Sequence, residues 1–156
     1  MKSGVSLYYL AFCSILSALS LVSCTPKSCK EETEILAGAT FYKTGTGMIS
    51  APDTLTLFGM GNKDSLLYDK AIKISVIYIP LDPNNDLCRF VLTIKQESDT
   101  LTFIYSPYAH LLSKECGYAF FYYLSECRFT KNILDTVIIR NPRITNRNEE
   151  NIRIFF

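Results

Sequence analysis

A period-two alternation of polar residues with β-branched and aromatic ones runs through this 156-residue chain from residue 34 onward. The runs are short, and turn residues such as Gly, Pro, Asn and Asp separate them. Such alternation places one set of side chains on each face of a strand, whereas a helix needs apolar residues three and four apart. The pattern therefore predicts an all-β fold.

Seven or eight short strands are expected, and no segment between them has the long amphipathic repeat of a helix. The expected strands cover residues 35–42, 54–58, 71–79, 88–95, 101–105, 117–124, 133–140 and 151–156. Strand 117–124 carries aromatic side chains on both faces, which is typical of a strand that is covered on both sides. This spacing predicts one domain over residues 34–156, an antiparallel β-sandwich, with a small closed barrel as the alternative.

The N-terminus has the three parts of a secretory signal. Lys2 supplies the positive charge, residues 5–19 are apolar, and the small Ser23 precedes Cys24. The sequence Leu21-Val22-Ser23-Cys24 has the form of a bacterial lipobox, in which the peptide is cut before the cysteine and the cysteine is acylated.

We therefore expect residues 1–23 to be removed and Cys24 to carry lipid that inserts into a membrane. Residues 24–33 would then form a lipidated tether. An uncleaved anchor is the alternative, because the apolar run is just long enough to span a bilayer. A protein exported without lipid is the third alternative.

The charges are balanced, with 16 Lys and Arg against 15 Asp and Glu and a net charge of +1. A protein that binds nucleic acid through its phosphates carries a clear excess of positive charge. No nucleic-acid partner is therefore expected, and the expected partners are the membrane and another envelope component.

Four cysteines remain once Cys13 leaves with the signal peptide and Cys24 is acylated. They are Cys29, Cys88, Cys116 and Cys127. No Cys-x-x-Cys pair is present and the chain has one His, so a zinc or thioredoxin-like site is not expected. Two disulfides are predicted, as in exported proteins, and three pairings are open.

The residues that could carry chemistry are few. His110 lies in the expected connection 106–115 without a nucleophile or carboxylate in a known motif, so we interpret it as a polar loop residue. Asp82, Asn84 and Asp86 alternate as calcium ligands do, but the chemistry of a turn explains them without a metal. We predict no catalytic residue, no metal and no cofactor.

Four hydroxyl residues each follow an aspartate and precede an aliphatic residue, as in the O-glycosylation sequon of exported Bacteroidetes proteins. They are Thr54, Ser65, Thr100 and Thr136. Asp before a β-branched residue is also a common way for a turn to lead into a strand. The four positions are candidate glycosylation sites.

Several motifs together resemble a family of small Bacteroidetes lipoproteins known only as a domain of unknown function. They are the lipobox with a second cysteine close behind it, Asp99-Thr100-Leu101-Thr102 with Tyr105, Cys116-Gly117-Tyr118, and the sequence from Ile144 to Phe155. The resemblance implies that Cys29 pairs with Cys116, which leaves Cys88 with Cys127. Members of that family often carry His at the position of Asn151.

Residue pattern and resemblance together favour a non-enzymatic lipoprotein of the outer membrane that binds another envelope component or stabilises an assembly. The alternatives are an enzyme that acts on envelope glycan or peptide, and a surface lipoprotein that binds glycans. The face of the membrane on which the domain lies is left open.

Overall fold

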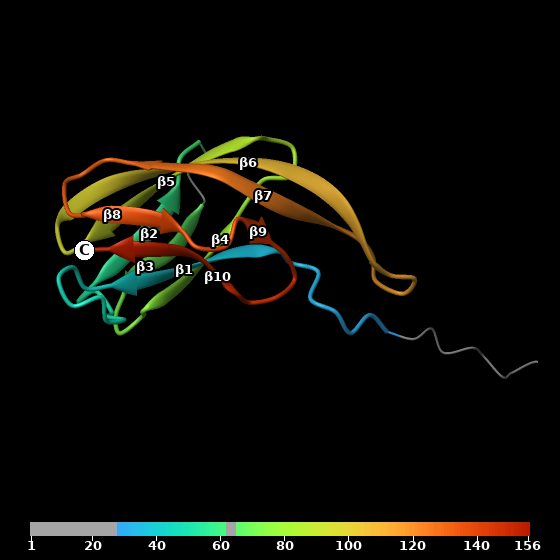
Figure 1. Cartoon of the computed structure of the whole chain (residues 1–156), viewed down its shortest axis with the longest axis horizontal. Coiled ribbons are helices and arrows are strands. Elements are labelled where there is room, and N and C mark those ends of the chain that lie inside the picture. The colour runs from blue at the N-terminus through green and yellow to red at the C-terminus, as the bar shows by residue number, and fades with distance from the viewer. Residues whose placement is uncertain (1–27, 62–64) are drawn as a thin grey trace, which may run out of the picture.

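The computed structural model describes residues 28–61 and 65–156, which form ten strands and no helix (Figure 1). The strands are β1 (Leu36–Tyr42), β2 (Leu55–Gly59), β3 (Leu66–Ala71), β4 (Val76–Pro80), β5 (Leu87–Ile94), β6 (Glu97–Ser113), β7 (Gly117–Phe129), β8 (Thr136–Ile139), β9 (Arg143–Ile144) and β10 (Glu150–Phe155). They form a sheet of four with the order β4-β1-β10-β8 and a curled sheet of six with the order β3-β2-β5-β6-β7-β9. The all-β prediction is confirmed, although the strands outnumber the expected seven or eight.

The predicted signal peptide and Cys24 lie outside the described residues. Within the described part of the chain, no helix has the length and apolar character needed to cross a membrane.

The four-stranded sheet joins the two ends of the described chain. Strand β1 pairs with β4 in antiparallel fashion and with β10 in parallel fashion, so that Ala39 lies opposite Ile152 and Phe41 opposite Ile154. The expected sandwich was antiparallel throughout, and this central pair departs from it. Two strands at opposite ends of a chain are free to run in the same direction because no short turn joins them.

The long β6–β7 hairpin dominates the six-stranded sheet. Its pairing runs from Leu101 opposite Phe129 to Ser113 opposite Gly117, and its outer end projects beyond the body of the domain (Figure 1). The predicted irregular connection 106–115 is therefore wrong, because residues 106–111 continue the ladder. His110 is a strand residue opposite Ala119 rather than a loop residue.

The core lies between the inner faces of the two sheets. Its largest fully buried side chains include Phe41, Leu57, Ile79, Leu92 and Phe103, none of which is more than 2 % exposed. Burying one such side chain contributes about 1.5–3 kcal/mol. Alternate residues of β2, β4, β5 and the inner part of β6 supply much of this core, as the period-two pattern predicts.

The predicted strand 71–79 covers the last residue of β3, a connection over residues 72–75, and most of β4, which belongs to the other sheet. Lys70 and Lys73 have positive φ angles of 45° and 60°, which end β3 and turn the chain toward β4. The buried face of β4 carries Ile77 and Ile79, whereas Ile72 on the connection is 60 % exposed. Apolar residues on both faces of this segment hid the change of direction.

We had expected the aromatic strand to be covered on both sides, but it is not. Tyr118 is 73 % exposed, and Phe120 and Tyr123 are each 48 % exposed. Tyr118 and Phe120 belong to the outer end of the hairpin, whereas Tyr123 lies opposite Arg143 of β9. Aromatic residues on both faces of a strand are equally compatible with a projecting ribbon.

A buried aspartate holds the connection between β7 and β8. Asp99, 1 % exposed, accepts hydrogen bonds from the Thr130 hydroxyl and from the backbone N–H groups of Asn132, Ile133 and Leu134. Burial alone would raise the pKa of Asp99, but these hydrogen bonds outweigh it and lower the pKa. Asp99, the aspartate of the second Asp-Thr-Leu motif, is thus a structural residue.

Two tyrosines of the inner face fix the connection between β4 and β5. The Tyr122 hydroxyl donates to the carbonyl of Leu81 at 2.9 Å, and the Tyr105 hydroxyl donates to the carbonyl of Asp82 at 3.0 Å. Burial raises the pKa of both phenols. The phenols therefore stay neutral, and their hydrogen bonds hold the β4–β5 connection against the six-stranded sheet.

Candidate functional site

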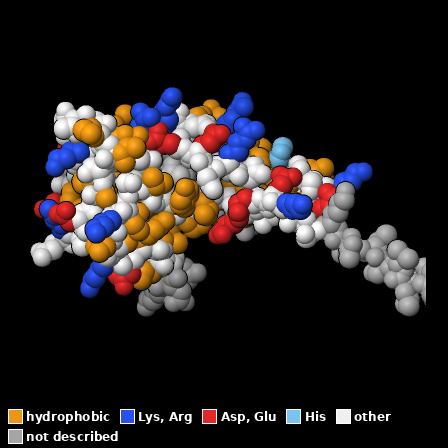
Figure 2. Space-filling model, turned by 90° about the horizontal axis from the view of Figure 1, so that it is seen from below, with side chains coloured by type: hydrophobic (Ala, Val, Ile, Leu, Met, Phe, Trp, Pro, Cys, Tyr) orange, Lys and Arg blue, Asp and Glu red, His pale blue; other side chains and the backbone are white. Residues whose placement is uncertain are grey.

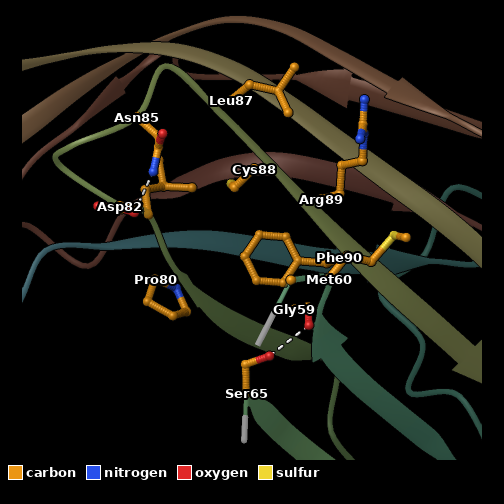
Figure 3. Close-up of a pocket in the computed structure, with 12 residues that line it drawn as sticks. Gly59, Met60, Ser65, Pro80, Asp82, Asn85, Leu87, Cys88, Arg89 and Phe90 are labelled. Atoms are coloured by element: carbon orange, nitrogen blue, oxygen red, sulfur yellow. Dashed lines mark hydrogen bonds between the residues drawn. The ribbon is translucent and has the colours of Figure 1, made fainter. Parts of the chain in front are cut away.

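A hollow of about 920 Å³ lies where β2 and β5 meet the connection between β4 and β5 (Figure 3). The side chains of Ser65, Asp82 and Asn85 on its wall already have hydrogen-bond partners within the chain. Asp82, whose carboxylate suggested a calcium ligand, accepts hydrogen bonds from the N–H of Asn84 at 2.9 Å and the amide of Asn85 at 2.6 Å. These bonds lower the pKa of Asp82. The Asp-Pro-Asn-Asn sequence is a turn stabilised by its own side chains.

Cys88 lies at this hollow, and its thiol is inert in the folded state. Burial raises its pKa to about 12. Burial raises the pKa of Cys127 to about 12 as well. Because the thiolate is the nucleophile, a thiol with such a pKa is almost wholly unreactive near neutral pH.

The cysteines are paired only in part as predicted. Cys29 and Cys116 form a disulfide with 4.7 Å between their Cα atoms, in agreement with the family resemblance. The predicted pairing of Cys88 with Cys127 is wrong, because both thiols are free.

The sheet register explains why the second disulfide does not form. Cys88 on β5 and Cys127 on β7 both lie opposite Phe103 on β6, so a whole strand separates them. Strands in a sheet lie about 4.8 Å apart, which puts the two Cα atoms about 9–10 Å apart. A disulfide needs Cα atoms within about 7 Å.

A smaller hollow, about 460 Å³ in volume, lies between the β6–β7 hairpin and residues 141–149, which connect β8 to β10. It is lined by His110, Phe121, Asn141, Arg143, Thr145, Asn146, Arg147 and Glu149. We call it the polar hollow. Four of these eight residues, Thr145, Asn146, Arg147 and Glu149, belong to the C-terminal sequence that carries the family resemblance.

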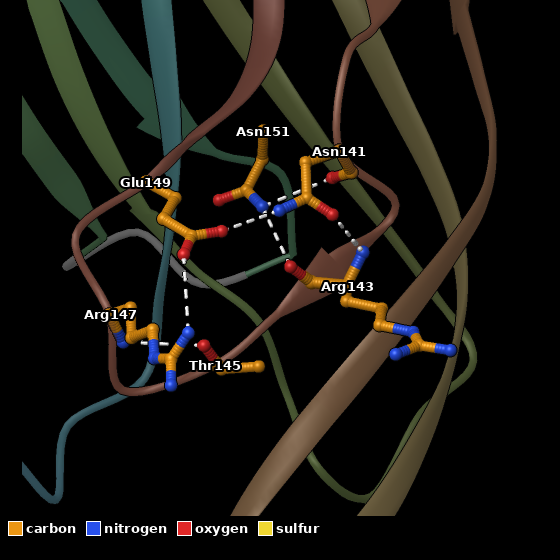
Figure 4. Close-up of polar contacts among 6 residues, drawn as sticks. All are labelled: Asn141, Arg143, Thr145, Arg147, Glu149 and Asn151. Carbon is orange, nitrogen blue, oxygen red and sulfur yellow. Dashed lines mark hydrogen bonds and ion pairs between the residues drawn. The ribbon is translucent and has the colours of Figure 1, made fainter.

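Asn151 fixes the wall of the polar hollow. This residue is 2 % exposed, and its amide donates to the carbonyls of Asn141 and Arg143 at 3.1 and 3.0 Å. Its own carbonyl oxygen accepts from the N–H of Gly38 at 3.1 Å. One side chain thereby ties the connection to β1, and all its hydrogen-bonding groups are used (Figure 4).

Gly38 allows this arrangement because there is no room for a side chain. A Cβ atom added there would lie 2.5 Å from the carbonyl oxygen of Glu149, a distance that real Cβ atoms essentially never show. The chain also shifts register between Gly38 and Ala39, where β1 and β10 come together. The close approach of the two strands positions the base of the polar hollow.

Some charged groups of the polar hollow have partners within the chain and others do not. Glu149 accepts a hydrogen bond from the amide of Asn141 at 2.6 Å and lies 4.0 Å from the guanidinium of Arg147. Arg143 points away from this cluster, and its guanidinium has no hydrogen bond or ion pair with the described residues (Figure 4). The side chain of Arg147 is 80 % exposed. Two guanidinium groups are therefore available to a ligand.

His110 forms a flat side of the polar hollow. Its ring stacks on Phe121, with the ring centroids 4.4 Å apart and the planes inclined by 23°. The imidazole of His110 forms no hydrogen bond with Glu149 or with any other described residue. The imidazole lies as a flat surface against an aromatic ring, which suits contact with a ligand.

A third cluster covers the outer face of the four-stranded sheet. The Tyr42 hydroxyl donates to Glu150 at 2.6 Å, Arg153 pairs with Glu150 at 2.8 Å, and the Tyr42 ring stacks on Phe155. Burial would raise the pKa of Glu150, but the bonds from Tyr42 and Arg153 lower it. These groups bond to one another and form a closed network rather than an open site.

The edge of β4 is partly closed to a further strand. The N–H of Tyr78 donates to the hydroxyl of Tyr68 at 2.9 Å, and Pro80, two residues further on, has no N–H to offer.

Figure 2 shows hydrophobic side chains gathered over the middle of the lower face of the domain. The exposed apolar side chains of β3, β4 and the connection between them are Leu66, Ile72, Val76 and Tyr78.

The candidate glycosylation residues differ in exposure. Thr136 is exposed on the edge strand β8, whereas Thr54, Ser65 and Thr100 are half-buried. The lipidation residue Cys24 lies outside the described residues. Modification at all five positions stays a prediction.

Sequence reasoning missed the two residues that do most to shape the polar hollow. Asn151 precedes an alternating strand and gave no sign that its side chain is buried. Gly38 lies within the expected first strand, where a glycine weakens a strand unless the backbone approaches another segment closely. A glycine inside an expected strand was therefore the available signal of a close approach between two backbone segments.

By its fold and its polar hollow, the molecule is an all-β protein of two sheets with a projecting hairpin and an open hollow that carries arginines. Residues 54–156 match the Family of unknown function (DUF6452), and because this match covers more than half of the chain, the protein belongs to that family. The matched part includes the hairpin and the whole polar hollow. Comparison with curated proteins and with solved structures finds no match.

Proposed function

We propose that the protein is a Bacteroidetes lipoprotein, anchored in the outer membrane through lipid on Cys24, that binds another envelope component without catalysing a reaction. The lipobox supports the anchor. The disulfide between Cys29 and Cys116 supports export, because disulfides form and persist in oxidising compartments outside the cytosol.

The polar hollow is the observation that carries the binding proposal. Arg143 and Arg147 present guanidinium groups, whereas the Asn146 amide already donates to the carboxylate of Glu31 at 3.2 Å. Guanidinium groups bind carboxylates and phosphates with paired hydrogen bonds. The ligand that suits this set is therefore an envelope component that carries an acidic group.

The geometry favours binding over catalysis. A glycan-cleaving enzyme needs two carboxyl groups across the scissile bond, and general base catalysis needs an oriented base. In the polar hollow Glu149 is held by Asn141, and His110 lies against Phe121. The guanidinium groups of Arg143 and Arg147 are hydrogen-bond donors, which hold an acidic ligand but do not attack it.

Crosslinking in the native envelope tests the proposal. The full-length protein with a C-terminal tag would be crosslinked in cells, extracted in detergent and examined by mass spectrometry. We expect one dominant component, and at least a tenfold lower yield of it with the double variant Arg143→Glu/Arg147→Glu. The matched control is Arg140→Glu, an exposed residue of the same segment that does not line the hollow.

Equal capture by both variants would refute binding at the polar hollow. The same preparation reports the mass of the N-terminal peptide. An N-terminus without acyl chains on Cys24 would refute the anchor.

A further inference from the structure

We propose that the outer end of the β6–β7 hairpin lies in the headgroup layer of the bilayer that holds the lipid anchor. The surface in question, which we call the hairpin face, consists of alternate residues of the two strands beyond the core: Pro107, Ala109, Leu111, Tyr118 and Phe120. The inference rests on the proposed lipidation of Cys24.

The hairpin face continues the inner face of the sheet past the edge of the domain. Phe103 and Tyr105 are buried on this face of β6, and residues at every second position after them share it. Residues opposite each other in an antiparallel pair lie on the same face, so Phe120 joins Ala109 and Tyr118 joins Leu111.

Within residues 28–61 and 65–156, no charged side chain belongs to this face and no second sheet covers it. Leu111 is 50 % exposed, Phe120 48 % and Tyr118 73 %. The opposite face of the same ribbon is different in character, because it carries His110 and packs Phe121 against it. The hairpin therefore has one apolar side at the end furthest from the body.

The disulfide places this end of the hairpin next to the anchor. Cys116 lies in the turn of the hairpin, directly before Gly117, and its Cα atom is 4.7 Å from that of Cys29. Cys29 follows Cys24 by five residues. Five residues span at most about 18 Å when fully extended, so the turn cannot lie further than about 23 Å from the acylated residue.

The same limit does not hold for the other end of the hairpin. From Glu97 to Ser113 the strand has 17 residues. At about 3.3 Å per residue these extend about 50 Å, if the curl of the strand is neglected. The tether thus brings only the apolar end of the hairpin to the membrane.

The side chains of the hairpin face are those found where proteins meet a bilayer. Tyrosine is enriched in the headgroup layer, because its ring is apolar and its hydroxyl stays hydrated. Phe120 and Leu111 can reach the outer acyl region. Lys114 in the turn can extend its ammonium group to lipid phosphates.

A fluorescence measurement tests the inference, because the chain has no Trp and each introduced indole reports one position. The processed, acylated protein with Tyr118→Trp would be reconstituted in phosphatidylethanolamine–phosphatidylglycerol vesicles with and without brominated acyl chains. We expect at least a twofold loss of emission in brominated vesicles. The matched control is Ile138→Trp on β8, 45 % exposed and outside the hairpin, for which we expect emission within a tenth of that in plain vesicles.

Both probes replace exposed side chains, so the fold should tolerate them. Equal quenching at the two positions, or none at position 118, would overturn the inference. Mass spectrometry of the same vesicles separates this result from failure of the proposed function. Acylated Cys24 with an unquenched probe refutes the membrane contact alone, whereas an unmodified Cys24 refutes the anchor and removes the basis of the inference.

Discussion

The substitution Asp99→Asn tests how much one buried carboxylate contributes to the free energy of unfolding. Both oxygens of Asp99 are used, Oδ1 by Thr130 and Asn132 and Oδ2 by the N–H groups of Ile133 and Leu134. Asparagine keeps one acceptor oxygen. Its amino group would take the place of Oδ2 and point hydrogens at two N–H donors.

The expected cost follows from those two donors. A buried N–H that loses its acceptor costs about 1–3 kcal/mol, so the variant should lose about 2–6 kcal/mol of unfolding free energy. A domain of this size has about 5–15 kcal/mol in total. The substitution should therefore leave a folded but marginal domain.

The loss should depend on pH. Because the pKa of Asp99 is lowered in the folded state, its contribution is complete above the unfolded pKa of about 3.9 and disappears as the pH falls through the lower folded value. The difference between Asp99→Asn and the parent should be full at pH 7 and shrink steadily below about pH 4.

Urea unfolding followed by tyrosine fluorescence measures both effects, since the chain has 10 Tyr and no Trp. With a slope of about 2 kcal/mol per molar, the midpoint should fall by about 1–3 M. The matched control is Asp53→Asn in the chain's first Asp-Thr-Leu motif, whose carboxylate is 75 % exposed and paired with Lys95. Equal small shifts for both variants would refute the assigned role of the buried carboxylate.

Three further outcomes can be checked. Gly38→Ala should lower the unfolding free energy by at least about 1–3 kcal/mol in a thermal melt, because its Cβ would lie 2.5 Å from the carbonyl oxygen of Glu149; an unchanged melting temperature would contradict the strand geometry. In the native protein at pH 8, iodoacetamide should leave Cys88 and Cys127 unmodified, because burial raises both pKa values to about 12, and peptide mass spectrometry should find both alkylated after unfolding; rapid native labelling would show that they are accessible. Asn151→Asp should cost more than about 3 kcal/mol in urea unfolding, because a carboxylate would face two carbonyl oxygens, and a neutral effect would count against the bonding pattern.

Alternation predicted most of the strands because burial in this fold follows it closely. Strand β5 is an example: Phe90, Leu92 and Ile94 lie at every second position and are at most 5 % exposed, whereas the residues between them are half-buried. The prediction was wrong for residues 71–79, where alternation continues through a change of sheet. A positive φ angle at Lys73 ends the run, and Lys gives no signal of such an angle.

The extent of the hairpin could not be predicted for a related reason. Residues 106–111 include Pro107, which usually argues against an interior strand. Pro107 lies opposite Tyr122, on a ribbon that has left the sheet on one side, where a missing donor costs little. Local pattern reports which residues favour a strand, but it does not report how far two strands stay paired beyond the core.

The polar hollow depends on contacts across long stretches of sequence. Asn151 binds the backbone of Gly38, a residue 113 positions earlier. The error over Cys88 and Cys127 has the same origin, since both pair with Phe103 from opposite sides. The resemblance correctly indicated the disulfide of Cys29 with Cys116, but the strand between the other two cysteines became visible only in the sheet order.

The parallel pairing of β1 with β10 sets the order in which the domain can be completed. Strand β1 has β4 on one side, but its other neighbour is the last strand of the chain, so the four-stranded sheet stays divided until β10 arrives. Contacts between such distant segments close slowly. A chain that crosses a membrane from its N-terminus onward would therefore remain unfolded in this sheet until translocation ends, and a chain cut after residue 149 should stay susceptible to protease.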